Sequence, residues 1–183
     1  DDFFVGKGAC YGDIQGSVCI LHERTSTRGH LLDSRFGPTT FAESVRNQSV
    51  GALAVVDGAV ANAGALKEYR RGFFTDAAKA AAADPFKGYI FNSRGNRGIG
   101  YHFVENLLLH EIDVYPVKDR PDTWFVPFEQ KHYYKIKAIF EDITEYNTGK
   151  FYDISTWSPA RAYNLDYSLV AEVPATGEKS AEA

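Results

Sequence analysis

The sequence predicts an α+β fold, with short helices in the N-terminal half, an antiparallel aromatic-rich sheet in the C-terminal half and irregular arms at both ends. Two observations predict it. Helix signals fall between residues 40 and 84, and short aromatic runs with strand periodicity follow residue 113. The 183 residues, 44% hydrophobic, suffice for one well-buried core. We expect an irregular N-terminal arm over 1–40, one α+β domain over 41–173 and a polar tail over 174–183.

Six glycines interrupt the first 40 residues, and the apolar run over Ser17–Leu21 predicts the single strand of this arm. Thr40 and Glu43 form a capping-box pattern, so a helix should begin at Phe41. The small residues of Val50–Leu66 include three glycines, which leaves two interpretations, a closely packed helix or a buried loop. The alanine-rich run over Asp76–Ala83 predicts a helix that Pro85 ends.

The second half begins with a predicted strand over Gly88–Asn92 and a flexible basic loop over Ser93–Gly100. A helix is favoured over Tyr101–Ile112, where apolar residues recur at helical spacing. His132–Phe140 alternates with a period of two, which predicts a strand. We expect an aromatic hairpin over 141–157, a further strand over Tyr163–Val173, and a solvated tail unless a partner holds it.

The net charge of −4 is unevenly spread, because residues 41–100 carry eight basic and five acidic groups while 101–183 carry eight and fourteen. This balance argues against a dedicated nucleic-acid-binding protein, although a local basic patch over 67–97 stays open. The apolar stretch Val50–Val56 ends at Asp57, far short of the ~20 residues of a membrane-spanning helix. No membrane span is predicted.

Cys10 and Cys19 are nine residues apart, so they form a disulfide if the chain between them doubles back, and stay reduced if they share an extended strand. A disulfide would indicate a secreted, periplasmic or luminal compartment. The chain begins with Asp1 and contains no methionine, from which we expect that a presequence or tag was removed. An organellar or secreted location is therefore favoured over the cytoplasm.

Two groups of polar residues contain side chains capable of metal binding or catalysis. On a helix His102, Asn106, His110 and Asp113 lie near one stripe with Glu105 beside it, but the two histidines are about 12 Å apart, too far for one metal ion. We therefore predict no metal site, and no motif indicates a cofactor. Cys19 lies close in sequence to His22, Glu23 and His30, but a structural cysteine is favoured over a nucleophile.

Arg94 and Arg97 are candidate binding residues, because guanidinium groups and backbone amides in a loop before a helix can hold an anion. The competing interpretation is a surface turn with solvated arginines. Twelve large aromatic residues between Trp124 and Tyr167 exceed what one core face holds, so we expect some to cover a binding surface. The candidates are Trp124, Tyr133, Tyr152 and Trp157.

These observations favour a non-catalytic accessory or structural subunit of a larger protein assembly, for example an organellar photosynthetic or respiratory complex. Its partners would be other protein subunits. One alternative is a small secreted or luminal enzyme that acts on a sugar or nucleotide through carboxylates such as Glu141, Asp142, Glu145 or Asp153. Another is a ligand-binding module that uses the aromatic face without chemistry.

Overall fold

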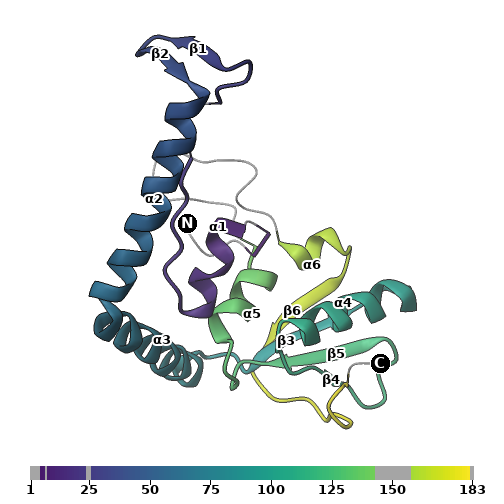
Figure 1. Ribbon diagram of the computed structural model, residues 1–183. Helices are drawn as coiled ribbons and strands as arrows, with labels where there is room; N and C mark the ends of the chain where they lie inside the picture. The colour runs from purple at the N-terminus through teal and green to yellow at the C-terminus, as the bar shows by residue number, and fades with distance from the viewer. Residues whose placement is uncertain (1–4, 7, 24–25, 143–157, 182–183) are drawn as a thin grey trace.

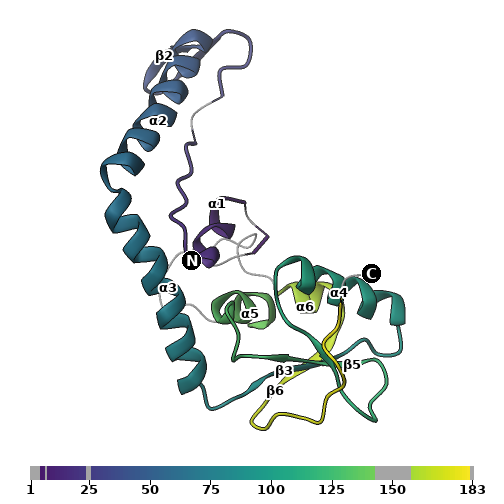
Figure 2. The same cartoon turned by 60° about the horizontal axis from the view of Figure 1, so that its bottom comes forward.

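The computed structural model describes residues 5–6, 8–23, 26–142 and 158–181 (Figure 1). A four-stranded antiparallel sheet forms the centre of what we call the body, residues 84–142 and 158–181. The strand order is β4-β5-β3-β6. The strands are β3 (Gly88–Asn92), β4 (Tyr115–Pro116), β5 (Thr123–Pro127) and β6 (Asp166–Val170). The helices α4 (Arg97–Leu109), α5 (Tyr133–Phe140) and α6 (Pro159–Ala162) all lie on one face of this sheet (Figure 2).

Aromatic rings fill the space between the sheet and these helices. Phe91 of β3 meets Phe103 of α4 edge to face at 5.1 Å, and Phe103 meets Phe140 of α5 at 5.5 Å. All three side chains are fully buried. On the opposite face of the sheet, Ile90 and Phe125 form a smaller cluster. The alternation along β3 therefore serves two apolar layers, as expected for a central strand.

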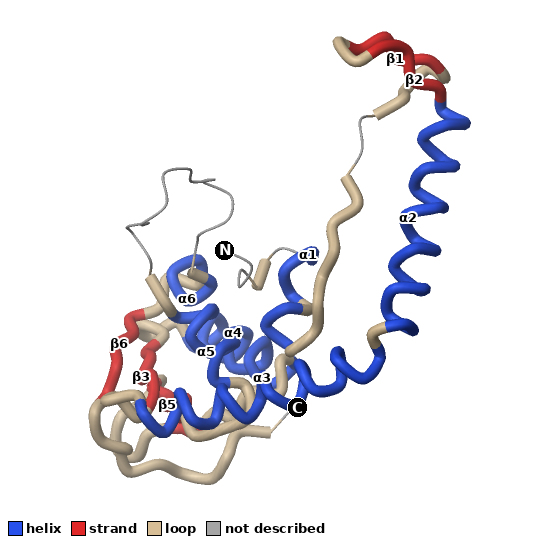
Figure 3. The backbone as a smooth tube through the Cα atoms, turned by 90° about the vertical axis from the view of Figure 1, so that its left-hand side faces the viewer, coloured by secondary structure: helices blue, strands red, loops and turns tan. Residues whose placement is uncertain are grey.

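The N-terminal half is extended in shape. A short helix α1 (Gly8–Tyr11) and a 3-10 turn η1 (Asp13–Gln15) lie against the body, and the chain then runs outward to a hairpin of β1 (Leu31–Ser34) and β2 (Gly37–Thr40). It returns through α2 (Phe41–Ala61) and α3 (Ala63–Ala83), which are bent by 78° relative to each other. Figure 3 shows α2 standing away from the body, joined to it by α3.

The predicted α+β class is confirmed, and several elements match. The capping box forms as predicted: Thr40 Oγ1 accepts from the Glu43 amide at 3.2 Å, and Glu43 accepts from the Thr40 amide at 2.9 Å. Strand β3 occupies the predicted Gly88–Asn92, and α3 ends directly before Asp84. The strand predicted over Tyr163–Val173 is present in its middle as β6.

One N-terminal expectation was wrong, and a second was met only in part. Ser17–Leu21 forms no strand, because the segment runs alongside α2 without pairing to another strand, and the hairpin lies at 31–40 instead. Val50–Leu66 is helical on both sides of Asn62, as one interpretation had it, but its residues are exposed or half-buried rather than packed. In addition α4 begins at Arg97, inside the predicted basic loop, where the Asn96 side chain caps it.

The strand predicted over His132–Phe140 was also wrong, because the segment forms α5. Tyr133, Ile136 and Phe140 are spaced three and four residues apart, and all three are buried, so the helical period decides. The sequence also fits a strand, because Lys135 and Lys137 would lie together on its more polar face. In the structure Lys135 is buried with the apolar residues, so no such polar face exists. Tertiary contacts settle such an ambiguity, and periodicity does not.

The described residues of the C-terminal tail, 174–181, are exposed or half-buried, and the body holds their backbone. Thr176 pairs with Val117, the Lys118 amide donates to Ala175, and the Ser180 amide donates to the Val114 carbonyl at 2.9 Å. Residues 175–180 therefore follow the edge of the sheet rather than extending into solvent. The predicted hairpin over 141–157 lies outside the described residues, apart from Glu141 and Asp142.

Candidate functional site

The predicted aromatic surface is largely core in the part of the chain that the structure describes. Trp124 is half-buried and stacks on Phe91 at 5.3 Å, while Tyr133 is buried and its hydroxyl donates to Asp84 at 2.8 Å. Burial and this hydrogen bond raise the pKa of the Tyr133 hydroxyl. The other two candidates, Tyr152 and Trp157, lie outside the described residues.

The two candidate arginines lie at the beginning of α4 and are exposed. Arg94 adopts a left-handed conformation with φ +53°, and its amide donates to Asn92 Oδ1 at 2.7 Å. Arg97 Nε lies 3.1 Å from Asp122 Oδ1. Arg97 thus has a carboxylate neighbour already, and anion binding at this turn stays a prediction.

Cys10 is buried and Cys19 is half-buried, and both are free thiols in this structure rather than the predicted disulfide. The bond stays a prediction for oxidising conditions. The backbone amide of Cys19 donates to Asp13 Oδ1 at 2.8 Å. This hydrogen bond holds residues 16–23, which we call the outgoing segment because they lead toward the hairpin, against η1. None of the described side chains completes a Cys/His pair with Cys19.

The histidine stripe predicted around α4 divides between two environments. His102 is exposed and contacts Glu105 at 3.3 Å, whereas His110 Nδ1 is 2.7 Å from the Tyr11 hydroxyl on α1. Among the described residues, three or more His, Cys, Asp or Glu side chains are nowhere close enough to hold a metal ion. The candidate catalytic carboxylates form no pair among the described residues. Asp142 pairs with Arg161 and Glu141 is exposed, while Glu145 and Asp153 lie outside the described residues.

Sequence reasoning missed a cluster of titratable groups between the end of α4 and the start of α5. Lys135, 1% exposed, donates through Nζ to the His110 carbonyl at 2.7 Å, and burial lowers the pKa of its ammonium to about 8. His132, also buried, lies 3.1 Å from Glu111, and burial lowers the pKa of its imidazole. Hydrogen bonds from Lys131 and His132 lower the pKa of Glu111 to about 2.

This cluster has a structural explanation. A cation that donates to the last carbonyls of a helix stabilises the negative end of the helix dipole, and Lys135 does so at the C-terminal end of α4. His132 joins the same helix end to α5 through Glu111. We assign these groups to the docking of α4, α5 and α1. A lysine inside an apolar run at 133–140 is the sequence signal that could have found them.

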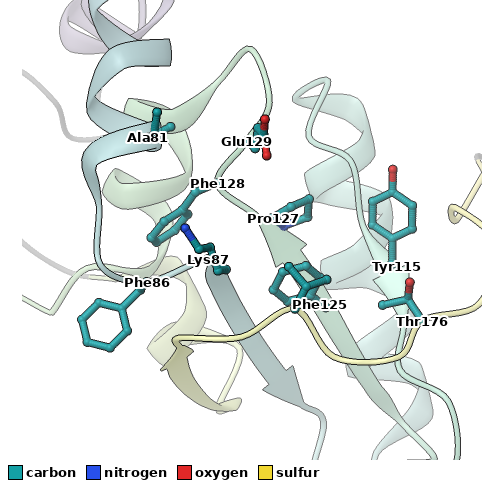
Figure 4. Close-up of a pocket in the computed structure, with 11 residues that line it drawn as sticks. Ala81, Phe86, Lys87, Tyr115, Phe125, Pro127, Phe128, Glu129 and Thr176 are labelled. Atoms are coloured by element: carbon teal, nitrogen blue, oxygen red, sulfur yellow. The ribbon is translucent and has the colours of Figure 1, made fainter.

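One pocket of about 530 Å³ lies at the edge of the sheet where α3 joins β3 (Figure 4). Its floor is apolar and includes Phe125, Pro127 and Phe128, and its charged lining residues, Lys87 and Glu129, are exposed. Glu129 is the single carboxylate among the described lining residues, so the pocket does not offer the carboxylate pair of a glycosidase.

Most of the exposed large apolar side chains among the described residues lie in the arm, by which we mean residues 16–23 and 26–62. All 21 residues of α2 are described and none is buried. Leu53 is 66% exposed and Val60 is 74% exposed. Exposed large apolar side chains occur along the whole arm: Val18, Ile20, Leu21, Leu31, Phe36, Phe41, Val45, Val50, Leu53, Val55, Val56 and Val60.

A groove of about 730 Å³ separates α2 from the outgoing segment. Val18, Ile20 and His22 line one side, and Gly51, Val55 and Gly58 line the other. The two walls touch where Gln48 Nε2 donates to the His22 carbonyl at 3.1 Å, and His22 lies against Gly51. The arm is therefore an open apolar structure with both its groove and its outer side accessible.

In comparisons with known proteins, no family model, no curated protein and no solved structure matches the chain. Among the described helices, none is by itself long and apolar enough to cross a membrane. The bent pair α2 and α3 reaches that length and hydropathy only together.

Proposed function

We propose that the chain is a non-catalytic subunit of a larger protein assembly and that its arm is the surface that other protein chains cover. One observation carries the proposal: from Val50 to Ala61 helix α2 is apolar on every side apart from Asp57, and none of these residues is buried. A helix that is apolar all round is normally enclosed by protein. The large apolar surface of the arm marks an interaction site, because soluble proteins rarely expose such patches unpartnered.

The stability of α2 points the same way. Isolated helices are marginal in water, and most helices in proteins are stabilised by packing of an apolar face. Here Gly51 and Gly58 each weaken the helix interior by about 1 kcal/mol, and the helix has no buried side chain to offset that cost. Contact with a partner supplies the missing packing.

Protein fits this surface better than lipid or nucleic acid does. Arg46 is the single basic residue of α2, whereas helices that lie on membranes carry a Lys- and Arg-rich polar face opposite the apolar one. Nucleic-acid surfaces likewise need clustered basic groups. The small residues Gly51, Ala54 and Gly58 instead let a partner backbone approach the groove closely.

The test compares two leucines of equal exposure in the protein expressed at native level in its own source. Leu53→Asp changes the arm, and Leu109→Asp, at a side chain 68% exposed at the end of α4, is the matched control. We expect wild type and Leu109→Asp to migrate in the same large complex on native size separation, and Leu53→Asp to leave it. Circular dichroism of each purified chain confirms that both variants fold.

The proposal is wrong if wild type migrates alone near 20 kDa at native concentration. It is also wrong in its assignment of the surface if Leu53→Asp stays in the complex while Leu109→Asp is lost from it.

A further inference from the structure

The outer side of α2 differs from the groove side in both chemistry and access. At 100° per residue, Gly51, Val55 and Gly58 face the groove, and Leu53, Val56 and Val60 face the opposite direction. Figure 3 shows that no described part of the chain lies against this outer side. The three outer side chains are each more than half exposed. The outer side of α2 is thus an apolar strip that the described residues leave uncovered.

The charges of α2 are few and regularly placed. Glu43 is used by the capping box, which leaves Arg46 and Asp57 as the remaining charged residues of the helix. They are 11 residues apart, close to three full turns, so both lie on the same flank of the outer strip about 20° apart. Neither has an ion-pair partner among the described residues.

Arg46 and Asp57 are symmetric about a point between Gly51 and Ala52, the middle of the helix. Each lies about 8 Å along the axis from that point. If a second α2 runs antiparallel across the same strip with a two-fold axis there, Arg46 of each copy meets Asp57 of the other. The two-fold operation keeps the charged flanks on one side, so both ion pairs form together.

We propose that the partner of the outer strip is a second copy of this chain, paired antiparallel through α2. Leu53, Val56 and Val60 then pack across the interface, with Ala42 and Ser49 opposite as small residues that let the helices approach. A parallel pair gains nothing from these charges, because its two-fold axis runs along the helices and puts the charged flanks of the two copies on opposite sides of the interface, where Arg46 and Asp57 form no ion pair.

The expected affinity is modest. The 21 residues of α2 give a helix about 31 Å long, and two such helices form an interface at the small end of the specific range. We expect dissociation constants on the order of micromolar. The bodies do not obstruct this pairing, because α3 leads away from the outer strip toward the body (Figure 1).

The experiment measures self-association of the purified full chain by sedimentation equilibrium over about 1 to 100 µM. Arg46→Asp and Asp57→Arg should each weaken the dimer by about tenfold or more, because each turns two attractive contacts into two repulsive ones. The double variant R46D/D57R should dimerise like wild type, and a one-to-one mixture of the two single variants should recover a heterodimer. Lys79→Asp, an exposed charge reversal on α3, is the control and should change nothing.

The orientation is tested by cross-linking in a background where Cys10 and Cys19 are replaced by serine. Leu53→Cys, on the outer strip next to the proposed axis, should form a disulfide-linked dimer on oxidation, and Val60→Cys should not, because antiparallel pairing separates its two copies by about 25 Å. Equal cross-linking at both positions indicates a parallel pair and overturns the proposal. A wild-type chain that stays monomeric at every concentration, or a single reversal that leaves the dimer unchanged, overturns it as well.

This inference rests on the proposed function but can fail separately from it. If the purified chain is monomeric while the protein in its source migrates in a large complex, the second copy is excluded and the subunit role stands. If the protein is monomeric in both, the two fail together. Sedimentation of the monomer with neutral phosphatidylcholine vesicles would show that lipid covers the strip and would overturn the dimer.

Discussion

The body and the arm bury their apolar residues in opposite ways. In the body, Phe103 and Phe140 are fully enclosed by neighbouring rings, and even a lysine at position 135 is covered and hydrogen-bonded. In the arm, Leu53 and Val60 are exposed to solvent, although α2 is about as apolar as α4 of the body. The body satisfies its own hydrophobic surface within the chain, and the arm does not. The buried apolar contacts that stabilise the fold are therefore concentrated in the body, and the arm is the region where we propose that a partner binds.

The largest expected effect comes from removing a body ring. Phe103→Ala should lower the free energy of unfolding by about 3 to 5 kcal/mol, because it leaves a cavity among Phe91, Phe140 and Tyr163. Leu53→Ala in the arm should change it by no more than about 0.5 kcal/mol in the free chain. Urea unfolding of both variants measures the contrast. Equal losses would mean that the arm is packed in solution.

A second effect is a pH dependence specific to the body. The pKa of Lys135 is about 8 in the folded chain against 10.5 as its ordinary value, so above pH 8 the unfolded chain holds more protons. The free energy of unfolding should therefore rise, on the order of 1 kcal/mol, between about pH 8 and pH 9.5. Above that range Tyr89 and Tyr133, whose pKa values burial raises, oppose the rise.

Lys135→Met keeps the apolar stem and should abolish this rise, whereas Lys79→Met, at an exposed lysine of α3, should preserve it. Thermal or urea unfolding at half-unit pH steps gives the slope for each variant. A rise of the same size in Lys135→Met would refute burial of the ammonium as its cause.

The smallest effect concerns the start of α2. Thr40→Ala removes the capping-box hydroxyl and should destabilise the first turn by about 1 kcal/mol. Because α2 buries no side chain in the free chain, the change should appear as faster hydrogen exchange in residues 41–45 and not in global unfolding. Ser49→Ala, which removes a hydroxyl bonded to the Val45 carbonyl inside the helix, is the control. A loss of global stability in Thr40→Ala would contradict this prediction, because it would show that the arm and the body unfold as one cooperative unit.

Local chemistry in the sequence predicted the fold where one interaction decides the structure. Thr40 and Glu43 located the beginning of α2, and Pro85 located the end of α3, because caps and proline act within a few residues. The strand prediction for His132–Phe140 was wrong because the sequence there fits both the strand period and the helix period. The contact that buries Lys135 against α1 joins residues far apart in the chain, so local sequence does not reveal it. The prediction of an aromatic binding surface was wrong for a similar reason. The number of aromatic residues suggested that some cover a surface, but most of the described rings lie in the core or pack against it.

The arm was predicted in part. The small residues of Val50–Leu66 predicted either a closely packed helix or a buried loop, and the structure shows helix whose side chains are not buried. Sequence alone cannot give this result, since a run such as Val50–Leu66 reads the same whether its partner is the same chain or another one. Only the three-dimensional arrangement shows that the body leaves α2 uncovered.

The central claim, that the arm exists to be covered by protein, is tested most directly by the native mass of the protein isolated from its own source without overexpression. The account predicts a complex well above 20 kDa. Dissociation by Leu53→Asp, with the complex kept by Leu109→Asp, would assign that mass to the arm. A protein that runs alone near 20 kDa would contradict the account.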